Sequence, residues 1–415
     1  MSKRRVVVTG IGVVSPLGDD RETVWGAVSQ GQSGIRRITS FDTSEYKVHI
    51  AGEIADFDPL EHFTKRELGR LDRFVQFALV AANSAIQDAG LDLDSEDRSR
   101  VGAYIGTGIG GLHEIEAQHT RLLRSGPNRT SPLMIPKLMT NAAAGQVAMR
   151  TGLLGPTMSC SSACASASHA IGEAYRSIAH GTVEVQVCGG AEAAITPIGL
   201  SGFQQMKALS TRNETPESAS RPFHVDRDGF VMAEGGAILV LEKLEHARAR
   251  GADIKAELIG YGASSDAYHI TLPEPEGQGA ARAMRNALAD ASVEPEQVDY
   301  INAHGTGTPA GDDVEAKAVC DVFGDHATEL AVSSSKSMFG HLLGASGSLE
   351  SAVCIWAMQE SVCPPTANLD EVDPDCCGLN FVPIEAQERE LDTVMNNSFG
   401  FGGHNVTLIF GRFSG

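Results

Sequence analysis

Two stretches of the chain place apolar side chains at helical spacing. Between residues 72 and 89 they recur every three or four positions and Gly90 follows, which predicts an amphipathic helix that ends at this glycine. A second helix is predicted over the positions Ala163, Ala167, Ile171, Ala174, Tyr175 and Ile178. Each pattern leaves one apolar face, so both helices are expected to pack against a core.

Short, continuous apolar runs lie between these helices and predict buried strands of an α/β protein. In the first part of the chain they cover residues 4–15, 101–106, 183–190 and 235–241. The segment 120–137 contains one glycine and three prolines, and we expect a long loop or cap there.

The order of elements repeats in the second part of the chain. The same order of predicted strands and helices is found again in the second part of the chain, over residues 255–265, 279–291, 298–305, 330–334 with 347–359, and 405–410. The strand candidates 101–106 and 298–305 both run into Gly-Thr-Gly. We therefore predict two pseudo-equivalent halves, residues 1–250 and 251–415, whose corresponding strand ends lie next to each other.

Composition excludes several classes of function. The chain has 415 residues, 42% of them hydrophobic, and no apolar run long enough to cross a membrane. A formal charge of −20 argues against nucleic acid or an anionic membrane as the main partner. The eight cysteines form no compact framework, so we expect a reducing, cytoplasmic location.

Cys164 is the candidate nucleophile. The helical pattern places it at or near a helix start, where free backbone N–H groups favour a thiolate. Its neighbours, Ser161 to Ser166, are small and leave room for a substrate carbonyl and for backbone donors. An inert cysteine packed in an Ala/Ser-rich helix is the alternative that this stretch alone leaves open.

Two histidines favour the catalytic alternative. His304 lies in Asn-Ala-His-Gly-Thr-Gly-Thr-Pro, and His341 ends Ser-Lys-Ser-Met-Phe-Gly-His; each motif follows a strand-like run. If the two halves are equivalent, both histidines can reach Cys164 despite the long separation in sequence. A thiol and two imidazoles at one site would suit nucleophilic acyl transfer.

These motifs, with Asn-Ser-Phe-Gly-Phe-Gly-Gly at residues 397–403, resemble the β-ketoacyl-acyl carrier protein synthases of the type II branch. The resemblance spans the whole chain and is nearer to the long-chain synthase II members than to the starter type. It implies a thiolase-like αβαβα five-layer fold. It also implies decarboxylative Claisen condensation of malonyl units with an acyl chain in fatty acid elongation.

The resemblance assigns catalytic roles to five residues. Cys164 would hold the acyl chain, and neutral His304 and His341 would donate hydrogen bonds to the enolate that forms as carbon dioxide leaves. Lys336 would support the histidines, paired with Glu350, which lies in an apolar helix and needs a partner. The backbone N–H groups of Cys164 and Phe401 would hold the oxyanion of the tetrahedral intermediate.

The resemblance also assigns substrate contacts. Thr306 and Thr308 would bind the phosphopantetheine arm, Ile109 and Phe203 would wall the acyl pocket, and Phe401 would gate it; Phe399 joins the substrate-binding set. Two positions depart from relatives, Gly307 where some have serine and His404 where threonine is common. No resident cofactor or metal is expected, because the phosphopantetheine arrives on the carrier protein.

The implied partners are acyl carrier protein, bearing malonyl and acyl substrates, and a second copy of the chain in a homodimer. An acidic carrier would be repelled by a charge of −20, so docking needs a local basic patch within about 8–10 Å, one Debye length. The candidates are Lys65, Arg66, Arg70 and Arg73, with Arg124, Arg129 and Lys207.

Other functions fit less well. A non-decarboxylating thiolase would need a second cysteine in Ser398–Asn405, which has none, and the Cys/His/Asn synthases would have asparagine in place of His341. A polyketide ketosynthase shares every motif and stays open, whereas a non-catalytic chain-length partner would lack Cys164. Gly106–Gly111 matches a dinucleotide-binding pattern without the acidic residue that should follow, and Cys160, Cys164 and His169 lack a fourth metal ligand.

Overall fold

The protein is built around a large mixed β-sheet, seen in a computed structural model that describes residues 3–376 and 378–415. The sheet contains eleven strands. On one side these are β1 (Val6–Val14), β4 (Val101–Gly106), β5 (Thr157–Met158), β6 (Val185–Glu192) and β7 (Gly235–Lys243). On the other side they are β8 (Ala256–Ser265), β9 (Tyr300–Asn302), β10 (Ala331–Ser333), β12 (Asn380–Phe381), β14 (Thr393–Gly400) and β15 (His404–Gly411).

The strand order shows the internal repeat. Outward from the middle of the sheet, one side reads β1-β7-β6-β4-β5 and the other β8-β15-β14-β9-β10-β12, in which only the last strand, β12, has no counterpart. Among the described residues, β1 pairs with β8 through Val6, Val7 and Val8, so the two sides join at a narrow seam. The predicted pair of pseudo-equivalent halves is therefore confirmed, while the exact division between residues 250 and 251 stays a prediction.

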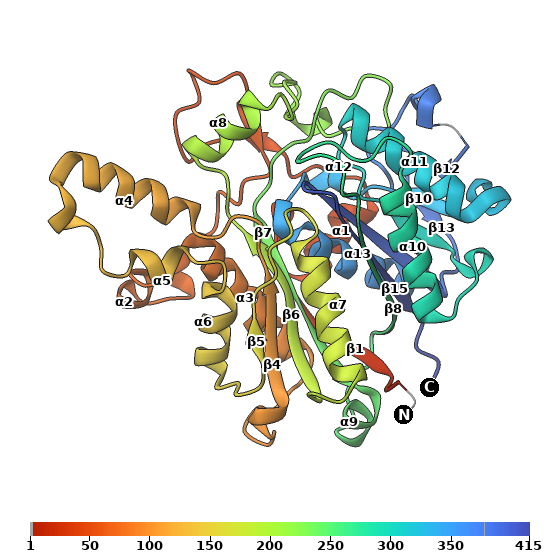
Figure 1. The fold of residues 1–415 in the computed structure, drawn as a ribbon, viewed down its shortest axis with the longest axis horizontal. Helices are drawn as coiled ribbons and strands as arrows, with labels where there is room; N and C mark the ends of the chain where they lie inside the picture. The colour runs from red at the N-terminus through yellow and green to blue at the C-terminus, as the bar shows by residue number, and fades with distance from the viewer. Residues whose placement is uncertain (1–2, 377) are drawn as a thin grey trace.

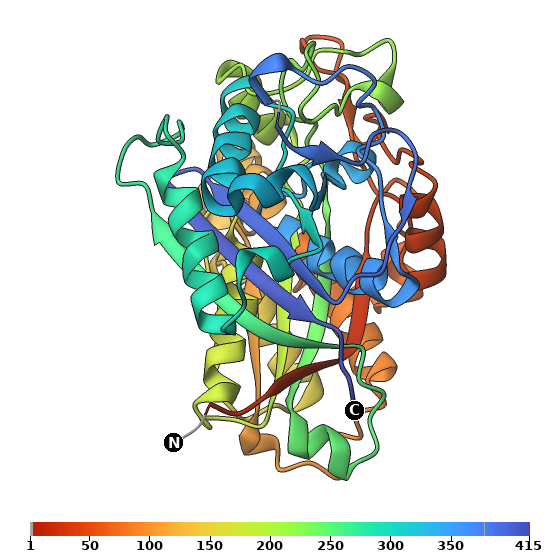
Figure 2. The same cartoon turned by 90° about the vertical axis from the view of Figure 1, so that its right-hand side faces the viewer.

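Helices cover and separate the two sides of the sheet (Figures 1 and 2). In the middle, α7 (Ser166–Ala179) and α13 (Ser346–Glu360) contact each other and strands of both halves. Helices α3 (Arg73–Asp88) and α6 (Ala142–Thr151) cover the outer face of the first half, and α10 (Gln278–Ala291) and α11 (Pro309–Phe323) that of the second. This is the five-layer αβαβα arrangement that the motifs predicted.

Local sequence explains where these helices begin and end. Helix α3 begins after Asp72, whose side chain accepts a hydrogen bond from the N–H of Phe74, and Gly90 follows it with φ +57°. Helix α13 is different because all but its last two residues are buried. A helix with no exposed face belongs in a central layer between the two halves of the sheet.

The remaining elements are short or peripheral. They are the helices α1 (Arg21–Ser29), α2 (Lys65–Leu68), α8 (Pro197–Gln205), α9 (Leu244–Ala249) and α12 (Lys336–Phe339), and the strand pairs β2 (Arg36–Arg37) with β3 (Ile50–Ala51) and β11 (Val362–Cys363) with β13 (Gln387–Glu388). Within the described ranges, no helix is both long and apolar enough to cross a membrane.

The segment 120–137, for which a long loop or cap was expected, is in large part helical. Helix α4 (Leu112–Ser125) extends through the first third of this segment and projects from the body in Figure 1, and α5 (Met134–Leu138) follows. Gly126 ends α4 with φ +80°. Pro127 and Pro136 lie in the first turns of their helices, where a missing N–H costs no hydrogen bond, so prolines did not break helical structure here.

Candidate active site

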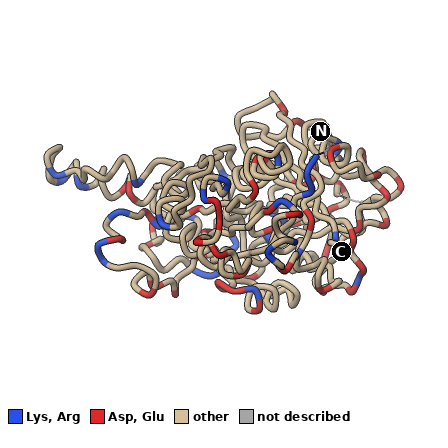
Figure 3. Tube along the Cα trace, turned by 90° about the horizontal axis from the view of Figure 1, so that it is seen from below, with Lys and Arg blue, Asp and Glu red and all other residues tan. Residues whose placement is uncertain are grey.

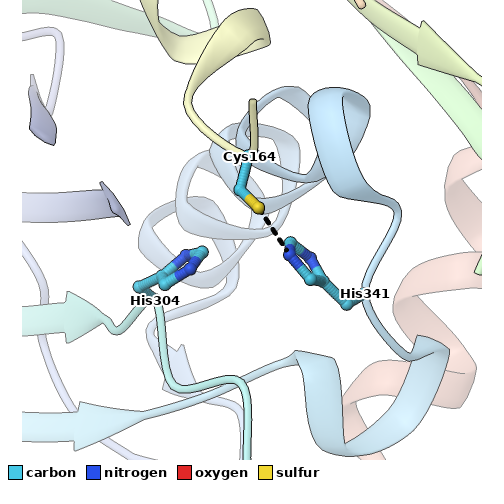
Figure 4. Close-up of side chains that lie close together, drawn as sticks. All are labelled: Cys164, His304 and His341. Atoms are coloured by element: carbon cyan, nitrogen blue, oxygen red, sulfur yellow. Dashed lines mark hydrogen bonds between the residues drawn. The ribbon is translucent and has the colours of Figure 1, made fainter. Parts of the chain in front are cut away.

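Three side chains from three segments meet at one point between the halves (Figure 4). Cys164 lies two residues before α7, His304 follows β9, and His341 follows α12. The Cys164 Sγ and one ring nitrogen from each histidine lie within 4.8 Å of one another. The Sγ is 3.0 Å from His341 Nε2. The structure thus brings together the three residues that the sequence selected.

A tight turn presents Cys164 to this space. Ala163 has φ +51°, an unusual conformation for a residue with a side chain, and the backbone of Gly400 packs closely against the turn. A Cβ on Gly400 would lie 2.7 Å from the carbonyl oxygen of Ser162 and 3.1 Å from the nitrogen of Cys164. Gly400 is therefore needed for this approach, and the nearby N–H of Phe401 lowers the pKa of the thiol.

The expected stabilisation of a thiolate is not what dominates at Cys164. Burial raises the pKa of the thiol to about 12, although the charge of Lys336 and the N–H of Phe401 act in the opposite direction. Desolvation of an anion here outweighs the donors near the helix start. Burial thus favours the neutral thiol at Cys164 in the unloaded site.

Both histidines are neutral. Burial lowers the pKa of His304 and His341 well below the ordinary value, and the nearby charge of Lys336 lowers it further. The His341 Nδ1 lies 2.8 Å from the Ser346 hydroxyl, so this hydroxyl can donate to Nδ1 and leave an N–H on Nε2 facing Cys164. The two rings lie edge to face, with centroids 5.5 Å apart. A positive Lys336 also opposes a metal cation at these ligands.

Lys336 and Glu350 form a buried ion pair beneath the histidines. The two side chains are only 1% and 0% exposed. Burial raises the pKa of the Glu350 carboxyl, and Lys336 counteracts this rise. Removing either partner would leave an uncompensated buried charge, so the pair fixes a positive group close to both imidazoles.

Sequence reasoning missed two carboxylates that hold the His304 loop. Glu315 accepts hydrogen bonds from the backbone N–H groups of His304 and Gly305, at 2.8 and 2.7 Å. Asp312 accepts from those of Thr306 and Gly307, both at 3.1 Å. Both acids lie on α11, the helix that follows the His304 motif. Their spacing of three residues, directly after the motif, was the feature of the sequence that could have indicated their role.

A cavity of about 520 Å³ opens from the three side chains. Its lining includes all the substrate-contact candidates, namely Ile109, Phe203, Thr306, Thr308, Phe399 and Phe401. The hydroxyls of Thr306 and Thr308 lie 3.0 Å apart on one wall. The cavity thus combines apolar walls with a few polar groups, as binding sites for small molecules do.

The candidate docking residues are distributed over several elements. Lys65 and Arg66 lie on α2 with Arg70 just after it, Arg129 ends the short turn after α4, and Lys207 lines the mouth of the cavity. Arg73 does not belong with them. Its guanidinium is paired with the buried Glu234 at 2.6 Å, so its charge is neutralised internally.

Models of protein families match most of the chain. The β-ketoacyl synthase N-terminal domain matches residues 3–247, and the β-ketoacyl synthase C-terminal domain matches residues 255–370. The chain belongs to the β-ketoacyl synthase family. This membership agrees with the fold and with the meeting of a cysteine and two histidines.

Two relatives that match this β-ketoacyl synthase over nearly their whole length carry the same name. It is 50% identical to the 3-oxoacyl-[acyl-carrier-protein] synthase 2 of Coxiella burnetii, with 99% of each chain covered. It is 48% identical to the synthase of the same name from Synechocystis sp., covering 100% of this chain and 99% of the relative.

Solved ketosynthases share the fold. The ishigamide ketosynthase/chain length factor superimposes with a TM-score of 0.93 at 38% identity, and all of each chain is covered. A β-ketoacyl synthase from Burkholderia phymatum gives a TM-score of 0.92 at 37% identity, with 99% of this chain and 100% of that chain covered.

Proposed function

We propose that this protein is a 3-oxoacyl-[acyl-carrier-protein] synthase of the synthase 2 type, which extends acyl chains with malonyl units in fatty acid synthesis. One observation carries the proposal: Cys164, His304 and His341 converge at the inner end of a largely apolar cavity. A thiol and two neutral imidazoles are the groups that acyl transfer followed by decarboxylation needs. The relatives named synthase 2, at about half identity over the whole chain, support the substrate class.

In the first half-reaction, the sulfur of Cys164 attacks the carbonyl carbon of an acyl thioester on the carrier. The thiol proton ends on the departing pantetheine sulfur, while the N–H on His341 Nε2, 3.0 Å from the Cys164 sulfur, stabilises the negative charge that develops on that sulfur. A C–S bond to Cys164 forms as the C–S bond to the carrier breaks. In this proposal the N–H groups of Cys164 and Phe401 hold the negative oxygen of the intermediate.

In the second half-reaction, the bond between the carboxylate and the α-carbon of the malonyl group breaks. Carbon dioxide leaves, and the electron pair forms an enolate whose oxygen accepts hydrogen bonds from His304 and His341. Neutral imidazoles suit this role because they donate an N–H without needing a strong base. The enolate carbon then attacks the acyl carbonyl, and Cys164 leaves with the electron pair of its C–S bond.

The thioester substrates bring their own prosthetic group, so no resident cofactor enters the proposal. Thr306 and Thr308 present hydroxyls beside the route from the cavity mouth to Cys164, where they can bind the amides of a phosphopantetheine arm. Ile109, Phe203 and Phe399 supply apolar walls for the acyl chain. A cytoplasmic site of action stays a prediction.

A homodimer is part of the proposal. Strand β5 ends the sheet of the first half, so its outer edge is open to another strand. Large apolar side chains are exposed around this edge and along α4 and α5, namely Leu122, Leu123, Leu133, Ile135, Met139, Met149, Leu154 and Met158. Apolar exposure next to an open edge is typical of a surface that a second copy covers.

Carrier docking is proposed for the basic end of the molecule. Figure 3 shows Lys and Arg at the end that carries α2 and α4, whereas Asp and Glu are frequent toward the other end. Lys65→Glu combined with Arg129→Glu should raise KM for carrier-bound substrates and leave turnover of a small pantetheine thioester nearly unchanged. Equal losses on both substrates would contradict docking at these residues.

A polyketide ketosynthase is the remaining alternative, since one similar structure is a ketosynthase/chain length factor and another is a type II PKS acyl-carrier protein in complex with its ketosynthase bound to the hexaketide. Their identities to this chain, 38% and 33%, are lower than the 50% shared with a synthase 2. A non-catalytic chain-length subunit is disfavoured because Cys164 is present in a complete cluster.

Product analysis tests the proposal directly. Incubation with malonyl and acyl carrier thioesters should yield β-ketoacyl carriers longer by two carbons, and mass spectrometry should find the acyl group on Cys164. Cys164→Ala should abolish both the β-ketoacyl product and the acyl group on residue 164. Cys164→Ser, which keeps a side chain of similar size, is the matched control. Acylation that persists in Cys164→Ala would contradict the assignment, and products lengthened by several unreduced units would favour the polyketide rival.

A further inference from the structure

The glycine-rich segment Gly106–Gly111 binds a carboxylate of the protein itself. After β4 its backbone wraps around the side chain of Glu192, the last residue of β6, which is 0% exposed. One oxygen, Oε1, accepts from the Thr107 hydroxyl at 2.8 Å and from the N–H groups of Ile109 and Gly110 at 3.2 and 3.4 Å. The backbone N–H groups of this glycine-rich segment, which could suggest a site for a nucleotide phosphate, thus bind the Glu192 carboxylate instead.

The second oxygen of Glu192 connects this loop to the segment that follows His341. Oε2 accepts from the N–H of Gly108 at 2.6 Å and from that of Gly344 at 3.1 Å. The two loops touch at this point, because a Cβ on Gly344 would lie 2.1 Å from the nitrogen of Gly108. A single carboxylate therefore holds both loops at a fixed separation.

Each of these loops carries one wall of the acyl cavity. Ile109 and Leu343 both line the cavity. The N–H of Ile109 donates directly to Glu192, and Leu343 precedes Gly344, whose N–H donates to Glu192. Leu343 is held at φ +50°, a conformation that the neighbouring contacts must maintain. The separation of the loops thus determines how far apart the two walls lie.

We propose that Glu192 is a positioning residue that sets the width of the acyl pocket and thereby the preference for long over short acyl chains. This inference rests on the proposed condensing function. Glu192 does not touch the reacting atoms; it acts through the backbone of Ile109 and Gly344. A long chain has to pass between both walls, whereas a short chain ends close to Cys164.

Glutamate is required because all five groups around its carboxylate are donors. A carboxylate offers acceptors on both oxygens, but glutamine would present an NH₂ group to one set of N–H donors. Glu192→Gln has nearly the same volume, yet it must lose bonds either to the Ile109 side or to Gly344. The walls then lose their common anchor without the creation of a cavity.

The test compares butyryl and dodecanoyl carrier substrates in Glu192→Gln. We expect kcat/KM for dodecanoyl transfer to fall about tenfold or more, and that for butyryl transfer less than about threefold, since small misplacements of a binding group are costly. Glu53→Gln is the matched control. Glu53 is also buried and accepts from the backbone N–H groups of Thr39 and Ser40, but the residues that it holds do not line the cavity.

A milder variant keeps the test decisive if Glu192→Gln does not fold. Thr107→Val removes only one donor and should shift the ratio of the two kcat/KM values in the same direction, by about threefold. An equal loss on both substrates, or an unchanged ratio in both variants, would overturn the inference. If the wild-type protein formed no β-ketoacyl product at all, the proposed function itself would fail, which is a distinct result.

Discussion

In both halves, a Gly-Thr-Gly loop at a strand end is held by a buried carboxylate, but the two loops serve different purposes. In the first half, the Gly-Thr-Gly loop after β4 surrounds the carboxylate of Glu192. In the second half, the Gly-Thr-Gly loop after β9 binds Glu315 and Asp312 through its backbone N–H groups. The first loop presents an apolar wall to the cavity, and the second presents His304. The corresponding loops after β4 and β9 are thus both held by buried carboxylates, but they present different side chains to the cavity.

The difference lies in where the supporting acid comes from. Glu192 comes from β6, which pairs with β4, and it also reaches Gly344 from the other half. Glu315 comes from α11, which directly follows its own loop, and the backbone N–H groups that donate to it are local; a more distant donor is the side-chain amide of Asn397, at 3.4 Å. A local support can fix one catalytic side chain, whereas a support from a distant segment can set the distance between two walls.

Removal of His304 should have the largest effect, because only the second loop contributes to the chemistry. His304→Ala should slow decarboxylation of the malonyl thioester by about 10²–10³-fold, which is the usual effect of losing one oxyanion donor. Self-acylation of Cys164 should stay within a few-fold of the wild-type rate. His341→Ala should behave alike in the decarboxylation assay, and a normal rate in either variant would mean that this ring is structural.

The support of the second loop should affect stability as a function of pH. Burial raises the pKa of Glu315 to about 7, above its unfolded value near 4.5. The folded state therefore binds the proton more tightly, so this contribution to stability is complete below about pH 4.5 and is lost as the pH rises through about 7. For one such group the loss amounts to about 3 kcal/mol.

Glu315→Gln should accordingly flatten the pH dependence of stability. Urea unfolding at about pH 5 and pH 8 should show a smaller decline in the free energy of unfolding than in the wild-type protein. Glu53→Gln controls for loss of a buried carboxylate, because hydrogen bonds lower the pKa of Glu53 and give it the opposite dependence. If the free energy of unfolding declined as much in Glu315→Gln as in the wild-type protein, the ionisation of Glu315 would not contribute to the pH dependence of stability.

The smallest effect should come from the wall of the first loop. Ile109→Ala removes apolar contact with the acyl chain and should reduce kcat/KM for dodecanoyl transfer by roughly tenfold, about 1–2 kcal/mol. Decarboxylation of the malonyl thioester should remain nearly normal, because Ile109 donates no hydrogen bond to the enolate. A comparable loss of decarboxylation would remove the contrast between the two loops.

Much of the architecture was contained in the sequence. The spacing of apolar residues predicted α3 and α7, and the repeated order of strands and helices predicted the paired halves. Four ordered motifs predicted the family and selected Cys164, His304 and His341. These features depend on local periodicity and on side-chain chemistry, which can be read along a chain.

Only the tertiary structure determined the electrostatics of the site. The sequence placed Cys164 near a helix start and suggested a thiolate, but burial by segments from both halves raises the pKa of its thiol to about 12. Arg73 looked like a free surface charge until Glu234 was found beside it. Glu192 carried no signal, because its five donors come from two loops distant in sequence. Desolvation and pairing depend on which segments meet, and this is decided when the chain packs.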